Sequence, residues 1–113
     1  ISMDPAIAHP GSRKALIGDA PTAEQQRRYS PEKNVASVTP PTFILHAVDD
    51  PSVPVDNALV MFNALRAHNV PTELHLFAVG KHGFGIRGAK GLPAAEWPQL
   101  AMNWIASLPE MKK

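Results

Sequence analysis

The stretch that decides the fold is "TFILHAVDDPSVPVDNALVMFNALRAHNVPTELHLFAV", residues 42–79. Its first six residues form a short, largely apolar run of β-forming side chains, which favours a strand buried on both faces. Residues 54–68 carry apolar side chains at helical spacing, and residues 72–79 alternate in polarity as a second strand does. The order strand, helix, strand predicts two parallel strands joined by a crossover helix.

Proline and asparagine mark the ends of the predicted helix. Pro54 suits the first helical position, Asn69 suits the residue just past the end, and Pro71 prevents continuation. The apolar face of this helix is predicted to consist of Val55, Ala58, Leu59, Phe62 and Leu65.

The flanking segments are less regular. Residues 1–20 are predicted to be mostly loop, because "HPGS" and "GDAP" are typical turn sequences. Thr22, with Gln25 three residues later, indicates a capping box and a short helix over residues 22–28. A last helix is predicted over residues 95–108, with Trp97 and Trp104 as core anchors and with Pro98 tolerated in its first turn.

Composition excludes several classes of protein. The 113 residues are 44% apolar and 19% charged, which is typical of one small globular domain. The net charge is +1, and the tail "EMKK" is too short for a polybasic segment, so neither a nucleic-acid nor a membrane partner is expected. The sequence has no cysteine, which rules out disulfide and thiolate chemistry but is compatible with any compartment.

Chain length and local pattern disagree. Two parallel strands alone do not make a stable sheet, and the residues before Thr42 contain no further convincing strand. We therefore expect the chain to be the C-terminal part of a larger domain. We also expect it to associate with itself or with the missing N-terminal part, because its strand edge and apolar faces need cover.

Two residues that can carry chemistry follow the two predicted strands. Asp50 comes just after the first strand, and His82, within "GKHGFG", comes just after the second. The carboxyl ends of parallel strands share one edge of a sheet, so these side chains are expected to meet there. An aspartate that orients a histidine is half of a Ser-His-Asp triad. The plainer alternative is that "DDPS" is an ordinary turn and that His82 is a solvated loop histidine.

Residues 46–86, "HAVDDPSVPVDNALVMFNALRAHNVPTELHLFAVGKHGFGI", resemble the C-terminal part of α/β-hydrolases. They are especially similar to the acetyl xylan esterase and feruloyl-esterase-like group, which is related to dienelactone hydrolases and prolyl oligopeptidases. Those proteins carry a glycine, two residues, the catalytic aspartate, two residues and a valine; here Ala47 replaces the glycine, and Asp50 and Val53 match. Their "GHGF" stands here as "KHGF", with Lys81 in place of the glycine. The resemblance implies that Asp50 is the triad acid and that His82 is the catalytic base.

The resemblance also implies a fold, an activity and a division of the chain. The fold is the α/β three-layer sandwich of parallel strands with crossover helices. Residues 1–41 are a connecting or cap-like segment, and residues 42–113 are a strand–helix–strand–helix unit of the same single domain. The implied activity of the parent protein is serine-dependent hydrolysis of small carboxylic esters, acetylated polysaccharide among them, with no cofactor.

One part of the family pattern is missing. The nucleophile of these enzymes lies in Gly-x-Ser-x-Gly, and none of the six serines here does. The 113-residue chain by itself is therefore expected to be inactive. Alternatives that stay open are a peptidase of the prolyl oligopeptidase type and a non-catalytic binding domain. A zinc site would draw on His46, Asp49, Asp50, His75 and His82, whose spacing matches no standard ligand pattern.

Overall fold

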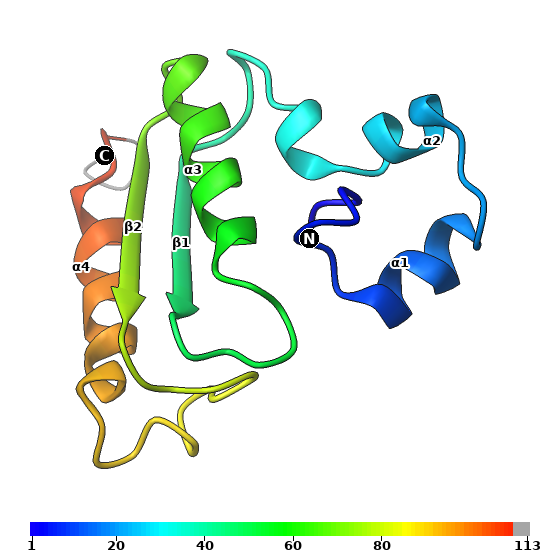
Figure 1. The fold of residues 1–113 in the computed structure, drawn as a ribbon. Helices are drawn as coiled ribbons and strands as arrows, with labels where there is room; N and C mark the ends of the chain where they lie inside the picture. Colours follow the sequence, from blue (N-terminus) through cyan, green and yellow to red (C-terminus); the bar gives the residue numbers. More distant parts are fainter. Residues whose placement is uncertain (110–113) are drawn as a thin grey trace.

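The computed structural model describes residues 1–109; the tail "EMKK" at residues 110–113 lies outside the described part. In chain order the elements (Figure 1) are α1 (Pro10–Ile17), α2 (Ala23–Arg28), the 3₁₀ turn η1 (Pro31–Lys33), β1 (Thr42–Ala47), α3 (Asp56–Ala67), β2 (Thr72–Phe77), the 3₁₀ turn η2 (Pro93–Glu96) and α4 (Trp97–Ser107).

The two strands and their crossover helix are as predicted. β1 and β2 pair in parallel from Thr42 opposite Thr72 to Ala47 opposite Phe77, and α3 connects them. The second strand ends two residues before the predicted end, because the chain turns toward the histidine loop after Phe77.

Helices cover opposite faces of this small sheet, because successive strand residues point to opposite sides. Ile44 packs against α3, whereas the ring of Phe43 lies 5.7 Å from that of Trp104 in α4. Figure 1 shows α3 in front of the strands and α4 on their other side. The last helix, predicted over residues 95–108, is divided into η2 and α4, with Pro98 in the first turn of α4 as predicted.

The ends and the buried face of α3 differ in detail from the prediction. The helix begins at Asp56, two residues after Pro54, and Asn69 takes the left-handed conformation (φ 56°) expected just past its end. Leu65 is fully buried as predicted, but Leu59 is 37% exposed. The inward face is completed instead by Met61 and Ala64, which pack around the cluster of Val35, Leu65 and Val70.

Residues 1–20 are mostly loop as predicted, but they also contain one helix that the prediction missed. Pro10 opens the eight-residue helix α1 at a position where its missing N–H costs nothing, and His9 caps the helix by accepting the N–H of Ser12 at Nδ1. Gly18 ends the helix at φ 78°. The capping box predicted for the next helix is present, with Thr22 and Gln25 each accepting the backbone N–H of the other.

The segment before β1 is tied to α3 through a buried asparagine. Asn57 Oδ1 accepts the N–H of Ser2 at 2.8 Å, and its Nδ2 donates to the carbonyl of Ile7 at 2.7 Å. Ser2 and Asn57 are both buried, so these hydrogen bonds are shielded from water. Residues 1–8 thereby lie alongside the start of α3, while α1 and α2 extend beyond it (Figure 1).

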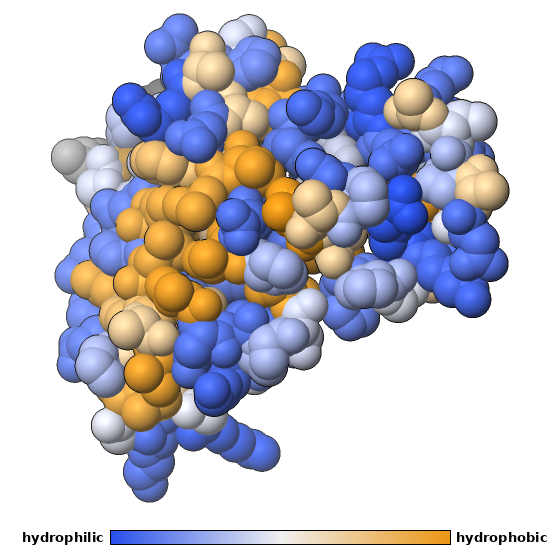
Figure 2. All heavy atoms as spheres, viewed as in Figure 1, coloured by the Kyte–Doolittle hydropathy of each residue, from blue (hydrophilic) through white to orange (hydrophobic). Residues whose placement is uncertain are grey.

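Apolar side chains remain at the surface over the strand and helix unit. Figure 2 shows a continuous apolar region on this face, and the exposed large side chains of the described residues include Leu59, Leu76 and Val79. None of the described helices is long and apolar enough to cross a membrane.

Candidate active site

Asp50 lies in the turn that follows β1, and backbone hydrogen bonds hold its carboxylate. Oδ1 accepts the N–H groups of Ser52 at 2.8 Å and Val53 at 2.9 Å, which is the local pattern that favours aspartate in turns. Pro51 and Pro54 restrict the backbone on both sides of these donors. The side chain of Asp50 is 6% exposed. Oδ1 is occupied by the two N–H groups of the turn, and Oδ2 remains available for another donor.

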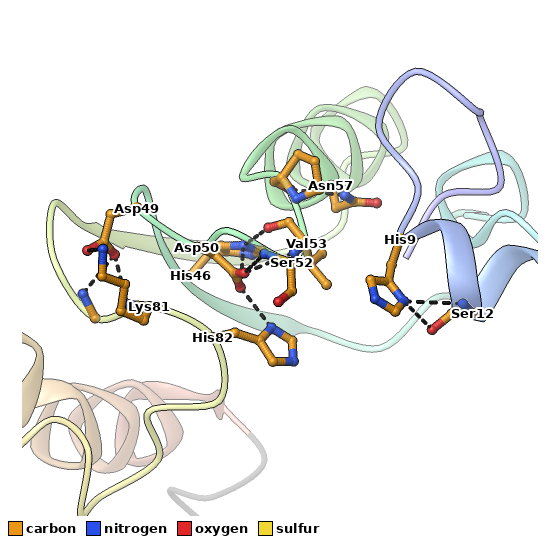
Figure 3. A network of polar contacts seen from close by, with 12 residues as sticks. His9, Ser12, His46, Asp49, Asp50, Ser52, Val53, Asn57, Lys81 and His82 are labelled. Carbon is orange, nitrogen blue, oxygen red and sulfur yellow. Dashed lines mark hydrogen bonds and ion pairs between the residues drawn. The ribbon is translucent and has the colours of Figure 1, made fainter.

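The second oxygen of Asp50 meets the histidine that follows β2. His82 Nδ1 lies 2.9 Å from Asp50 Oδ2 (Figure 3). The side chain of His82 is 56% exposed. An ionised carboxylate can only accept, so the proton of a neutral His82 belongs on Nδ1 and Nε2 is left with its lone pair free. The expected meeting of the two side chains at the carboxyl edge of the sheet is therefore present.

The carboxylate of Asp50 is kept ionised despite its burial. Burial raises the pKa of Asp50, but hydrogen bonds from the Val53 N–H, the His82 ring and the Ser52 N–H together outweigh it. The pKa of Asp50 is consequently lowered from the ordinary value of 3.8. At neutral pH the group is thus a fixed negative charge beside the imidazole.

His46 supports the same turn from within β1. Its Nε2 lies 2.9 Å from the carbonyl oxygen of Val53 and 3.5 Å from Asp50 Oδ2, and its side chain is 14% exposed. The shorter contact makes Nε2 a donor to the carbonyl. His46 is therefore a hydrogen-bonded histidine at the end of β1 that supports the turn.

Asp49 points away from Asp50 and holds the histidine loop (Figure 3). Its Oδ1 accepts the N–H groups of Gly80 at 2.9 Å and Lys81 at 2.8 Å, and Lys81 Nζ lies 3.3 Å from Oδ2. The hydrogen bond from the Lys81 N–H is the largest cause of the lowered pKa of Asp49. The sequence indicated Asp49 only as a candidate zinc ligand, and the one signal for a role at this site was its place beside Asp50 at the end of a strand.

A hollow of about 350 Å³ opens beside the Asp50–His82 pair. Its lining includes Leu45, Ala47, Phe84 and Trp97, so it is mostly apolar around the one exposed imidazole. Trp97 belongs to this wall, and its Nε1 donates to the carbonyl of Gly85 at 2.9 Å. The arrangement offers a base beside an apolar surface, which suits a neutral organic substrate.

Of the residues considered for zinc, His46 and His82 both lie against Asp50, whereas Asp49 and His75 have other partners. His75 lies against Phe43 and pairs with Glu73 at 2.8 Å. Within residues 1–109 no group of three or more histidine, aspartate or glutamate side chains is arranged to hold a metal ion.

Comparison with known proteins points to one family. The model of the prolyl oligopeptidase family matches residues 13–107. The chain is 38% identical over 78 residues to endo-1,4-beta-xylanase B of Butyrivibrio fibrisolvens, a match over 69% of this chain. It is also 32% identical over 117 residues to an acetylxylan esterase of Xylanibacter ruminicola, a match over 100% of this chain.

The solved structures agree on the fold. A structure of an acetyl ester-xyloside bifunctional hydrolase from Caldicellulosiruptor lactoaceticus superposes with a TM-score of 0.88 and 44% identity, over 95% of this chain and 39% of that one. The predicted fold class, α/β-hydrolase with parallel strands and crossover helices, is confirmed. The chain spans 12% and 24% of the lengths of the two curated relatives.

Proposed function

The chain belongs to the prolyl oligopeptidase family of α/β-hydrolases, and we propose that the protein containing it hydrolyses small carboxylic esters. Acetyl groups on a polysaccharide are the substrate class we favour. Support comes from two similar proteins whose names describe them as an acetylxylan esterase and as an acetyl ester-xyloside hydrolase.

The observation that carries the proposal is the hydrogen bond of 2.9 Å between Asp50 Oδ2 and His82 Nδ1. With the proton held on Nδ1, the free Nε2 is the base that takes a proton from a nucleophilic hydroxyl as its oxygen attacks the ester carbonyl. The same Nε2–H then protonates the leaving alcohol when the carbon–oxygen bond breaks. Asp50 remains ionised throughout and stabilises the imidazolium that forms between the two transfers.

We propose that the nucleophile is a serine outside residues 1–113. Within the described residues 1–109, His82 makes one hydrogen bond, to Asp50, and no serine of the sequence lies in Gly-x-Ser-x-Gly. The chain by itself is then inactive, because acyl transfer requires both a nucleophile and donors to the oxyanion.

A second candidate is peptide hydrolysis, which the name of the matching family favours. The same aspartate and histidine would serve it, since ester and amide hydrolysis by serine enzymes share their proton transfers. A non-catalytic binding domain is the candidate from another class. A Gly-x-Ser-x-Gly motif encoded upstream would argue against it.

The experiment measures the full-length protein against p-nitrophenyl acetate, acetylated xylan and an N-blocked Gly-Pro p-nitroanilide, with His82→Ala as the inactive reference. Saturable release of acetate that His82→Ala abolishes is the expected result. Preference for the anilide would transfer the proposal to peptidase activity. Background hydrolysis that is identical in both proteins would overturn the enzymatic proposal.

A further inference from the structure

His82 is carried by a loop whose shape is unusual for its sequence. Lys81, directly before it, has a φ of 61°, and Gly83, directly after it, has a φ of 62°. Glycine adopts this left-handed backbone readily, but lysine seldom does, so a lysine persists there only where surrounding contacts hold it. The direction in which His82 leaves the backbone therefore depends on whatever stabilises the turn at Lys81.

Asp49 makes the contacts that can do this. Its Oδ1 accepts both the Gly80 and the Lys81 N–H groups, at 2.9 and 2.8 Å, which fixes the plane of the peptide that enters the left-handed residue. The ion pair to Lys81 Nζ adds less, because the lysine side chain is 70% exposed and exposed ion pairs contribute little.

The other side of the same loop segment is fixed by close packing. A Cβ placed on Gly80 would lie 2.9 Å from Ala47 Cβ and 2.9 Å from Phe84 Cδ1, so the backbone already lies directly against the end of β1. Asp49 holds this segment through hydrogen bonds, and Asp50 holds the ring of His82. Both carboxylates belong to the turn after β1, so this one turn holds both the backbone before His82 and the ring of His82 (Figure 3).

We propose that Asp49 is a positioning residue for His82, which it serves through the backbone of Gly80 and Lys81 and without touching the substrate. The inference rests on the proposed role of His82 as the catalytic base. It assigns distinct tasks to the adjacent aspartates: Asp50 sets the tautomer of the ring, and Asp49 sets the place from which the ring projects.

The test compares Asp49→Ala, Asp49→Asn and Asp49→Ala/Lys81→Gly in the full-length protein. Asp49→Ala removes both acceptors, so kcat should fall about 10²-fold with little change in KM, the loss expected from a misplaced catalytic group. Asp49→Asn keeps one oxygen for the two N–H groups and should retain most of kcat. Glycine takes the left-handed turn without help, so Lys81→Gly should recover much of the activity lost in Asp49→Ala.

A second readout follows the ring itself. Nitrogen and proton NMR of His82 should show a protected Nδ1–H in the wild type, a weakened one in Asp49→Ala and a restored one in the double variant. Asp19→Ala is the matched control, because Asp19 forms a comparable ion pair with Lys14 at 3.4 Å but accepts no loop hydrogen bonds, and it should change neither readout. Thermal unfolding of each variant distinguishes a misplaced His82 ring from an unfolded protein. If Asp49→Ala does not fold, Asp49→Ala/Lys81→Gly is compared directly with the wild type.

The outcomes are distinct. Wild-type kcat and a wild-type Nδ1–H signal in Asp49→Ala would overturn the inference, as would a loss that Lys81→Gly does not relieve at all. If the wild type has no hydrolytic activity, the proposed function fails, but the ring signal still decides whether Asp49 positions His82.

Discussion

Asp50→Asn replaces one oxygen of the buried carboxylate by an NH₂ group and leaves the size of the side chain unchanged. The introduced amide can take two orientations, which differ in whether its oxygen or its NH₂ group faces the backbone N–H donors. If its oxygen takes the place of Oδ1, it keeps the N–H groups of Ser52 and Val53, and the NH₂ then faces His82 Nδ1. The reverse orientation leaves both backbone donors without an acceptor.

The expected loss of kcat follows from the preferred orientation of the amide. Each buried donor left unsatisfied costs about 1–3 kcal/mol, so the first orientation is preferred by a few kcal/mol. The NH₂ group then donates to Nδ1, which moves the imidazole proton to Nε2 and removes the base. The negative charge beside the imidazolium is also lost. We expect kcat to fall about 10⁴-fold, as it does in serine proteases given the wrong tautomer, which is about 5 kcal/mol of transition-state stabilisation.

The assay is steady-state hydrolysis of p-nitrophenyl acetate by the full-length wild type and by Asp50→Asn, with Asp19→Asn as a surface control. The ¹⁵N shifts of His82 should report the Nδ1–H tautomer in the wild type and the Nε2–H tautomer in the variant. A folded Asp50→Asn protein that keeps kcat within tenfold of the wild type would refute the reasoning. So would a larger loss from Asp49→Asn, because that would identify Asp49 as the acid.

Three further predictions concern stability and association. The pKa of Asp50 is lower in the folded protein than the ordinary 3.8, so its contribution to the free energy of unfolding is complete above pH 3.8 and is lost as pH falls through the folded pKa. Urea unfolding at decreasing pH should therefore show a steeper loss of stability for the wild type than for Asp50→Asn, and equal slopes would contradict this. Gly80→Ala places a methyl group 2.9 Å from Ala47 Cβ and from Phe84 Cδ1 and should lower the free energy of unfolding by about 1–3 kcal/mol. Adding Ala47→Gly should restore part of this stability. Thermal denaturation that shows no loss of stability in Gly80→Ala would disprove the close approach. The 113-residue chain alone should sediment as dimers or larger species, because each described strand pairs on one edge only and the apolar face of Figure 2 is open, and a compact monomer would count against this expectation.

The features that the sequence predicted correctly depend on short-range physics or on a general rule of topology. Thr22 and Gln25 form a capping box across three residues, and Asn69 adopts the left-handed conformation just past the end of a helix. Both features could therefore be recognised from neighbouring residues in the sequence. Asp50 and His82 are 32 residues apart, yet their meeting was foreseeable because parallel strands bring their carboxyl ends to one edge.

Local signals failed where two of them competed. Pro10 and Gly11 indicate a turn, but Pro10 also suits the first position of a helix, and His9 is an uncommon cap. The His9 side chain accepts the Ser12 N–H and so stabilises the start of α1, a contact that composition does not suggest. The first residue of α3 was misjudged for a related reason, since a proline before a helix does not specify which later residue opens it.

Apart from the pair of Asp50 and His82, only the tertiary structure decided which distant partners the polar groups take. Asn57 lies on the predicted helix, yet its hydrogen bonds to Ser2 and Ile7 span 55 and 50 residues and depend on how the first segment packs. Asp49 and Asp50 are adjacent residues of the same type, and the resemblance to the hydrolase family indicated Asp50 as the acid but gave no partner for Asp49. The turn after β1 directs Asp50 to the His82 ring and Asp49 to the loop backbone, and each carboxylate accepts the donors that packing has brought to its own side.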